Sequence, residues 1–82
     1  MHYEKIFVEI RAKFLQEGGV CPLEIVWTDG KRYIIDKVKF IENKPCRTGG
    51  VLPIRYTVTV QGQERYLYYL KDIERWFLEK KI

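Results

Sequence analysis

The stretch IRYTVTVQGQERYLYYL, from Ile54 to Leu70, decides the fold class of this chain. Apolar and polar residues alternate up to Gly62, and a second run of β-prone residues follows at once. Alternation with a period of two is typical of a half-buried strand, and glycine supplies the positive φ that a tight hairpin needs. The stretch therefore predicts an antiparallel hairpin and an all-β domain.

The length of the hairpin loop decides which side chains share a face, because a slip of one residue reverses every side chain. A two-residue loop places Val58 and Val60 on the face of Arg65 and Leu67. A three-residue loop groups the two valines with a different set, namely Tyr66, Tyr68 and Leu70. We favour the three-residue loop, since it collects the apolar residues on one side of the sheet.

The upstream segments show the same period of two. From Tyr3 to Phe14 apolar residues alternate with charged ones, which predicts a strand that ends before Gly18-Gly19. A run from Pro22 to Thr28 and another from Lys31 to about Glu42 flank Asp29-Gly30, a pair typical of type I′ hairpins.

A two-residue loop at Asp29-Gly30 would pair Trp27 with Arg32 and Ile25 with Ile34. The predicted core face then consists of Leu23, Ile25, Trp27, Ile34, Val38 and Phe40. The predicted opposite face carries Val26, Tyr33 and Ile35 beside Lys31, Lys37 and Lys39.

The remaining segments complete the predicted domain. Residues 43–53 contain two prolines and a glycine pair, so we expect a long loop. Residues 71–82 fit either a helix or a turn followed by a strand, and the aromatic pair Trp76-Phe77 favours the strand. The chain as a whole, residues 1–82, predicts one all-β domain: a small antiparallel barrel or half-barrel of five or six strands, of SH3-like or OB-like size.

Composition limits the classes of function. The chain has 82 residues, of which 46% are hydrophobic and 15% aromatic, which is enough for one globular domain. Its net charge of +4 permits a nucleic-acid or acidic partner without requiring one. No apolar run approaches the roughly 18 residues of a membrane span, and acidic residues near the N-terminus argue against a signal peptide. We therefore expect a cytoplasmic protein with no membrane partner.

The few reactive side chains argue against an enzyme. The chain has no serine, so a Ser/His/Asp triad is excluded, and a Cys/His pair would require His2 at the terminus. Cys21 and Cys46 should be free thiols in a reducing compartment, although a disulfide stays open as an alternative if their loops meet. With His2 as the sole histidine we expect no metal and no other cofactor. A non-catalytic binding module remains.

Nucleic acid is the first candidate partner of such a module. Aromatic rings stack on bases and cations neutralise phosphates when a single strand lies on a small barrel. The residues predicted to form this contact surface are Lys31, Tyr33, Lys37, Lys39, Lys44, Arg47 and Arg55.

A protein partner or a homodimer is the alternative. The chain has more aromatic side chains than one small core holds, and tyrosine and tryptophan are favoured at interfaces. The residues expected on such an uncovered face are Phe7, Val26, Ile35, Tyr69 and Phe77.

Four short motifs lie between Trp27 and Glu79. They are W-x-x-G-[KR]-[RY] at Trp27, Gly30, Lys31 and Arg32, an R-x-Y-x-V-type strand that reads RYTV from Arg55 to Val58, a Tyr-Leu strand at Tyr66 and Leu67, and W-[FY]-L-E from Trp76 to Glu79. With these motifs the chain resembles a group of short, functionally uncharacterised bacterial proteins. The resemblance brings no activity with it, because none is established for the group.

Overall fold

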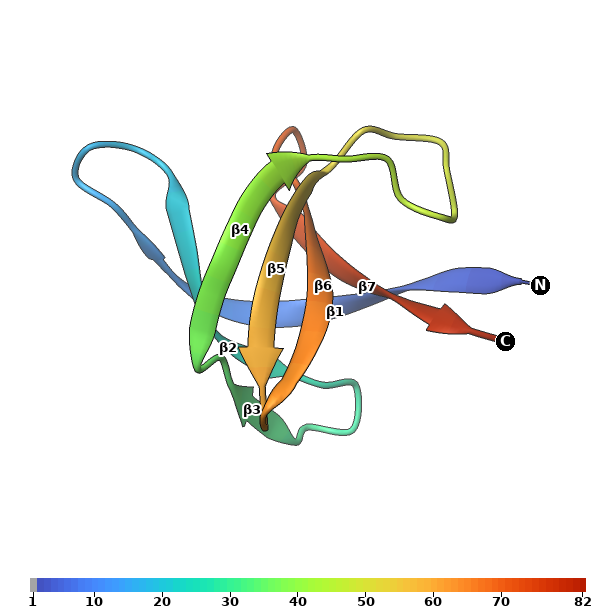
Figure 1. The fold of residues 1–82 in the computed structure, drawn as a ribbon, viewed down its shortest axis with the longest axis horizontal. Helices are drawn as coiled ribbons and strands as arrows, with labels where there is room; N and C mark the ends of the chain where they lie inside the picture. Colours follow the sequence, from blue (N-terminus) through green and yellow to red (C-terminus); the bar gives the residue numbers. More distant parts are fainter. Residues whose placement is uncertain (1) are drawn as a thin grey trace.

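A computed structural model describes residues 2–82, and these residues form seven antiparallel strands and no helix. The strands are β1 (Tyr3–Phe14), β2 (Val20–Val26), β3 (Arg32–Ile34), β4 (Lys37–Asn43), β5 (Ile54–Val60), β6 (Gln63–Leu70) and β7 (Arg75–Lys81). They lie in the order β3-β2-β1-β7-β6-β5-β4, in a sheet that curls into a half-barrel (Figure 1). The predicted all-β class is confirmed, as is the strand at the C-terminal end.

The long strand β1 joins the two parts of the sheet. Its first half, Tyr3 to Val8, pairs with β7, and its second half, Glu9 to Phe14, pairs with β2. The pairing with β2 is irregular between Arg11 and Ala12, opposite Pro22. Proline has no N–H to donate to the neighbouring strand, and such a bulge bends a sheet, so the irregularity falls where the sheet curls.

Two consecutive residues between β3 and β4 close one end of the half-barrel. The N–H of Ile35 donates to the carbonyl oxygen of Leu23 at 3.0 Å, and the N–H of Asp36 donates to that of Thr59 at 2.8 Å. Leu23 belongs to β2 and Thr59 to β5, so this short link joins the second strands from the two edges of the sheet. The link also divides the expected strand of residues 31–42 into β3 and β4, which raises the strand number from the predicted six at most to seven.

The main core lies inside the half-barrel. Trp76 is at its centre, with its ring 4.3 Å from the ring of Tyr69 and 5.2 Å from that of Tyr56. The hydroxyl of Tyr56 donates a 2.9 Å hydrogen bond to the carbonyl oxygen of Val20, so this buried polar group is satisfied. Val58 and Leu67 fill the space around these rings.

A second cluster lies on the other face of the same sheet. Phe77 is fully buried, with an exposed fraction of 0%, and its ring is 5.1 Å from that of Tyr68 and 5.6 Å from that of Phe7. Cys46, from the loop between β4 and β5, belongs to this cluster. The loop therefore covers the outer face of β6 and β7, and aromatic side chains are buried on both sides of these strands.

The register of the first hairpin differs from the prediction. Gly30 has a positive φ, but Asp29 does not, so the turn is not type I′. The Asp29 carboxylate instead accepts a hydrogen bond from the N–H of Lys31, and the N–H of Trp27 donates to the carbonyl oxygen of Lys31. The loop thus contains five residues, and Ile25 pairs with Tyr33 rather than with Ile34.

This shift by one residue corrects the predicted faces. Ile35 is buried and Ile34 is exposed, the reverse of the prediction. Leu23 and Phe40, both predicted in the core, are exposed, because Leu23 lies at the irregularity opposite β1 and Phe40 follows a second one in β4. Of the residues predicted for the core face, Ile25 is buried and Val38 is partly buried against the core.

The second hairpin has a two-residue loop, so the favoured three-residue loop is wrong. Gln61 and Gly62 both have positive φ, 52° and 76°, as a type I′ turn requires. Val60 pairs with Gln63 and Val58 with Arg65. The prediction assumed that one face collects the apolar residues, whereas the second cluster buries apolar residues on the other face as well.

Candidate nucleic-acid interface

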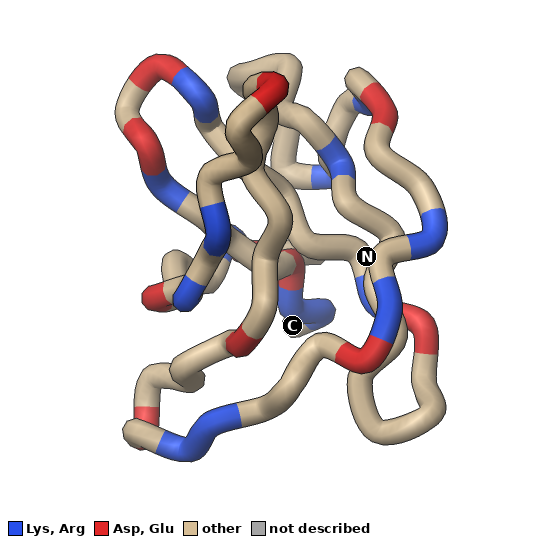
Figure 2. The backbone as a smooth tube through the Cα atoms, turned by 90° about the vertical axis from the view of Figure 1, so that its left-hand side faces the viewer, with Lys and Arg blue, Asp and Glu red and all other residues tan. Residues whose placement is uncertain are grey.

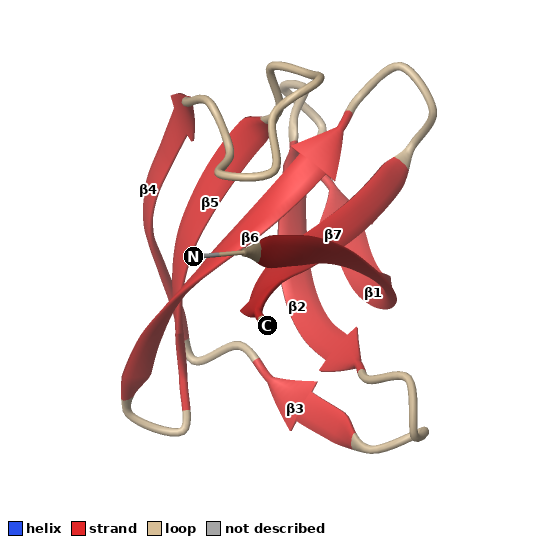
Figure 3. Ribbon diagram, turned by 90° about the vertical axis from the view of Figure 1, so that its right-hand side faces the viewer, coloured by secondary structure: helices blue, strands red, loops and turns tan. Residues whose placement is uncertain are grey.

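An open groove of about 690 Å³ lies at one end of the half-barrel. It is bounded by the turn between β2 and β3, the turn between β5 and β6, and the last residues of β7. Figure 3 shows these elements around the C-terminus. Ile25, Val60 and Leu78 line its apolar part. We call this hollow the barrel-end groove.

Two aromatic side chains line the barrel-end groove. Trp27 lies in the turn after β2, where its backbone is held by hydrogen bonds with Lys31 and Gly30. Tyr33 comes from β3, pairs with Ile25 and packs partly against the core. Both side chains are half-buried, so each ring is held in place while part of it remains accessible in the groove.

Three cationic side chains line the same groove. Arg65 comes from β6, and its Nη2 donates a 2.6 Å hydrogen bond to Oε1 of Gln63, which orients the guanidinium. Lys80 and Lys81 come from the end of β7 and are exposed. Within residues 2–82 neither lysine forms an ion pair, so both charges are available to an anionic ligand.

The groove exists because β6 and β7 diverge. They pair only where Tyr68 to Leu70 lie opposite Arg75 to Phe77, whereas β7 continues alongside β1 as far as Lys81. The first half of β6, from Gln63 to Leu67, is therefore not paired with β7. The resulting wedge opens toward the C-terminus and forms one side of the groove.

Ion pairs engage most of the cations that the sequence predicted as the contact surface. Lys39 pairs with Glu64 at 2.9 Å, and Glu42 lies between Lys44 at 3.7 Å and Arg55 at 3.5 Å. Lys and Arg positions are interspersed with Asp and Glu positions along the backbone (Figure 2). The guanidinium of Arg55 also lies 4.2 Å from the centre of the Tyr66 ring.

The other predicted contact residues are spread over the molecule. Tyr33 lines the barrel-end groove, and Lys31 lies in the neighbouring turn beside Asp29 at 4.0 Å. Lys37 is exposed on the edge strand β4. Arg47 lies in the loop after β4, with its guanidinium 5.0 Å from the centre of the Tyr3 ring. The structure thus brings one of the seven predicted residues into the groove.

The sequence prediction missed Trp27, Lys80 and Lys81 as groove residues. Trp27 was assigned to the core by the incorrect register of the first hairpin. Lys80 and Lys81 follow the aromatic pair Trp76-Phe77 in residues 71–82, a segment whose sequence fits either a helix or a strand. The only local signal in the sequence was the pair of consecutive lysines before Ile82, in a tail that otherwise mixes apolar and charged residues.

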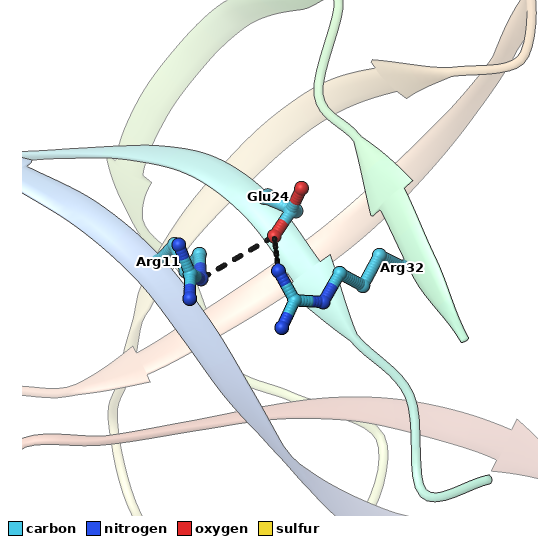
Figure 4. A network of polar contacts seen from close by, with 3 residues as sticks. All are labelled: Arg11, Glu24 and Arg32. Atoms are coloured by element: carbon cyan, nitrogen blue, oxygen red, sulfur yellow. Dashed lines mark ion pairs between the residues drawn. The ribbon is translucent and has the colours of Figure 1, made fainter. Parts of the chain in front are cut away.

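A three-residue network on the outer side of β1, β2 and β3 illustrates how other cations are engaged. Oε1 of Glu24 lies 3.5 Å from Nε of Arg11 and 3.7 Å from Nη1 of Arg32 (Figure 4). This carboxylate oxygen is buried and accepts no hydrogen bond from the described residues, so the two ion pairs are its polar contacts. Arg11 and Arg32 are therefore held by a structural contact that joins three strands.

The residues predicted for a protein interface are largely covered. Phe77, Tyr69 and Ile35 are buried, and Phe7 and Val26 are half-buried. The expectation that they stand on an uncovered face is wrong for the three buried residues, because the loop of residues 44–53 covers Phe77 while the half-barrel encloses Tyr69 and Ile35.

The loop between β4 and β5 is fixed to β7 by Glu79. The carboxylate accepts hydrogen bonds from the N–H of Arg47 at 3.0 Å and from that of Thr48 at 2.6 Å. Partial burial would raise the pKa of Glu79, but these hydrogen bonds, together with those from the side chains of Thr48 and Tyr68, lower it below its ordinary value. Lys5 adds a 3.0 Å hydrogen bond from Nζ to the carbonyl oxygen of Gly49.

Other kinds of site find little support in the described part of the chain. Across residues 2–82 no group of three or more His, Cys, Asp or Glu side chains is placed to hold a metal ion. Cys21 and Cys46 are free, and Cys46 is buried. The same residues contain no helix long and apolar enough to cross a membrane.

Comparisons with known proteins identify no relative. No family model matches the chain, and neither the curated proteins nor the solved structures contain a match. The resemblance to short bacterial proteins therefore stays an expectation.

Proposed function

We propose that the protein is a non-catalytic module that binds single-stranded nucleic acid in the barrel-end groove. The observation that carries the proposal is the presence of two aromatic rings, Trp27 and Tyr33, and three cations, Arg65, Lys80 and Lys81, in one hollow. Stacking on aromatic side chains contributes about 1–3 kcal/mol per base, and cations along the groove neutralise the phosphates. The expected cytoplasmic setting belongs to this proposal.

The depth of the groove favours single strands over duplexes. Trp27 and Tyr33 are half-buried among the residues that line the hollow. In a duplex the faces of the bases are covered by their neighbours, so recessed rings cannot stack on them, whereas the bases of a single strand can turn into the groove. The amide side chains of Gln61 and Gln63, which also line the groove, offer hydrogen bonds to base edges.

Fluorescence anisotropy with labelled single strands tests the proposal. We expect the double substitution Lys80→Glu and Lys81→Glu to abolish most of the binding and to reduce its salt dependence. Lys13→Glu with Lys71→Glu is the matched control, because both lysines are exposed, lie outside the groove and give the same change in net charge. Equal losses in the two double variants would show that only net charge matters and would reject the groove.

Trp27→Leu separates stacking from charge. We expect it to weaken binding by about 1–3 kcal/mol without changing the slope of affinity against salt, because stacking releases no counterions. Trp76 is buried in the core, so quenching of the Trp27 emission reports on the groove. If no oligonucleotide binds even at low salt, the proposal fails.

A protein-binding function is the second candidate, and one observation favours it. Phe40 and Tyr66 lie on either side of Thr57 in one row of paired residues across β4, β5 and β6. Their exposed fractions are 56% and 45%, so two rings are accessible on the outer face of the sheet. Sedimentation of the wild-type protein and of a Phe40→Ser, Tyr66→Ser variant tests this candidate. A dimer that dissociates in the variant and ignores oligonucleotides would support it.

A further inference from the structure

A second hollow on the outer face of the sheet shares residues with the barrel-end groove. This outer hollow has a volume of about 240 Å³ and is lined by Arg47, Tyr66 and Tyr68 among others. Arg65, Leu78 and Glu79 line both hollows. The two hollows are therefore adjacent, with these three residues at their common boundary.

The three shared residues lie along the wedge between β6 and β7. Arg65 lies in the part of β6 that is not paired with β7. Leu78 and Glu79 lie in β7 just after Phe77, the last residue of β7 that pairs with β6. No backbone ladder joins the strands here, so side chains such as the fully buried Leu67 fill the wedge, and Arg65 lies at the boundary of both hollows. Figure 3 shows β6 and β7 diverging toward the C-terminus.

The charges along this path favour an anion. Four cationic side chains line the two hollows together: Arg47, Arg65, Lys80 and Lys81. Two carboxylates also line them, and each is already engaged. Glu64 pairs with Lys39 at 2.9 Å, and Glu79 accepts the N–H groups of the loop. The net field that a ligand meets is therefore positive.

Aromatic rings are present at both ends of the path. Trp27 and Tyr33 lie at the inner end, and Tyr66 is exposed at the outer end with the Arg55 guanidinium over its ring. Tyr66 follows Arg65 in β6 and lines the outer hollow. Tyr33 lines the barrel-end groove, so the two rings lie on different sides of the wedge.

We propose that one nucleic-acid strand occupies both hollows and crosses from one to the other past Arg65, which contacts its backbone at the crossing. This inference rests on the proposed function and extends it, since it defines the path and the length of the ligand. A short strand fills only the barrel-end groove, and a longer one also contacts Arg47 and Tyr66.

A comparison of oligothymidylates of about 4 and about 12 nucleotides, the lower and upper parts of the range for small barrels, tests the path. We expect Arg47→Ala to weaken the long strand about five- to ten-fold and to leave the short one unchanged. The substitution removes the side chain but keeps the N–H that donates to Glu79, so the loop stays in place. Arg65→Ala should weaken both strands.

Lys44→Ala is the control, because Lys44 lies in the same loop as Arg47 and lines neither hollow. Amide NMR shifts of Arg47 and Tyr66 that appear with the long strand alone would support the path. If Arg47→Ala changes neither affinity, or changes both equally, the path is wrong while the groove remains. If neither oligonucleotide binds the wild-type protein, the proposed function itself fails.

Discussion

The carboxylate of Glu79 in β7 accepts a 2.6 Å hydrogen bond from the N–H of Thr48, in the loop between β4 and β5. A second bond from the N–H of Arg47 completes the contact. The loop packs on the cluster of Phe77 and Tyr68 through Cys46, so this contact helps to keep the second aromatic cluster away from water. A long proline- and glycine-containing segment is thus fixed by one anion with two backbone donors and by the hydrogen bond from Lys5 to the carbonyl oxygen of Gly49.

Glu79→Gln is expected to destabilise the protein by about 1–3 kcal/mol, the usual cost of losing charge-assisted hydrogen bonds at a partly buried group. Urea unfolding monitored by circular dichroism measures it. Glu64→Gln is the control, because Glu64 is exposed and its pair with Lys39 should contribute no more than about 1 kcal/mol. Equal losses in the two variants would contradict the anchoring role.

The pH dependence of this contact has a defined direction. Because hydrogen bonds hold the pKa of Glu79 below its ordinary value of 4.5, the stabilisation is complete above that pH. It is lost as the pH falls through the lower pKa of the native state. The wild-type protein should therefore lose its advantage over Glu79→Gln in acid, and a difference that persists unchanged at low pH would argue against the assignment.

Alkaline pH should also destabilise the protein. Burial raises the pKa of Tyr56, Tyr68 and Tyr69 above the ordinary value of 10.0. Above about pH 10 the unfolded chain releases these protons while the native state retains them, so stability falls as the pH rises. Tyrosinate absorbance followed together with circular dichroism should show a group of tyrosines that ionise only as the fold is lost. Ionisation of all six tyrosines near pH 10 in a folded protein would contradict this prediction.

The sequence predicted the elements better than their relative positions. Alternation around Gly62 and the aromatic pair Trp76-Phe77 identified strands correctly, because the period of two is a local property. The registers failed, since each depends on a contact that the pattern does not contain. The Asp29 carboxylate binds the N–H of Lys31 and lengthens the first loop, and burial on both faces of β6 removes the assumption behind the second.

The candidate site was harder to predict than the fold. The barrel-end groove is formed by two turns and the end of β7, which are far apart in the chain and adjacent only in the closed half-barrel. The predicted surface combined cationic side chains with one tyrosine, and Tyr33 alone of that set lines the groove. Ion pairs such as those of Glu42 with Lys44 and Arg55 engage several of the predicted cations on the outer face.

The turn at Gln61-Gly62 offers a stabilising substitution. Gln61 has a φ of 52°, a left-handed conformation that is unfavourable for most residues and tolerated best by asparagine after glycine. Gln61→Asn should therefore stabilise the protein by about 0.5–1 kcal/mol. Urea unfolding should show a higher midpoint with an unchanged slope. Gln61→Val should lower the midpoint, and a reversed order of the two variants would exclude a type I′ turn.

The strongest test of the corrected first hairpin uses two neighbouring isoleucines. Ile34 has an exposed fraction of 67% and Ile35 one of 9%, whereas the register predicted from the sequence reverses them. Ile35→Ala should cost about 2–4 kcal/mol, because it leaves a cavity where the link between β2 and β5 closes the half-barrel. Ile34→Ala should change stability by no more than about 0.5 kcal/mol, as expected for an exposed position. The two substitutions remove the same atoms from adjacent residues, so a larger loss at Ile34 would restore the type I′ register and overturn the observed one.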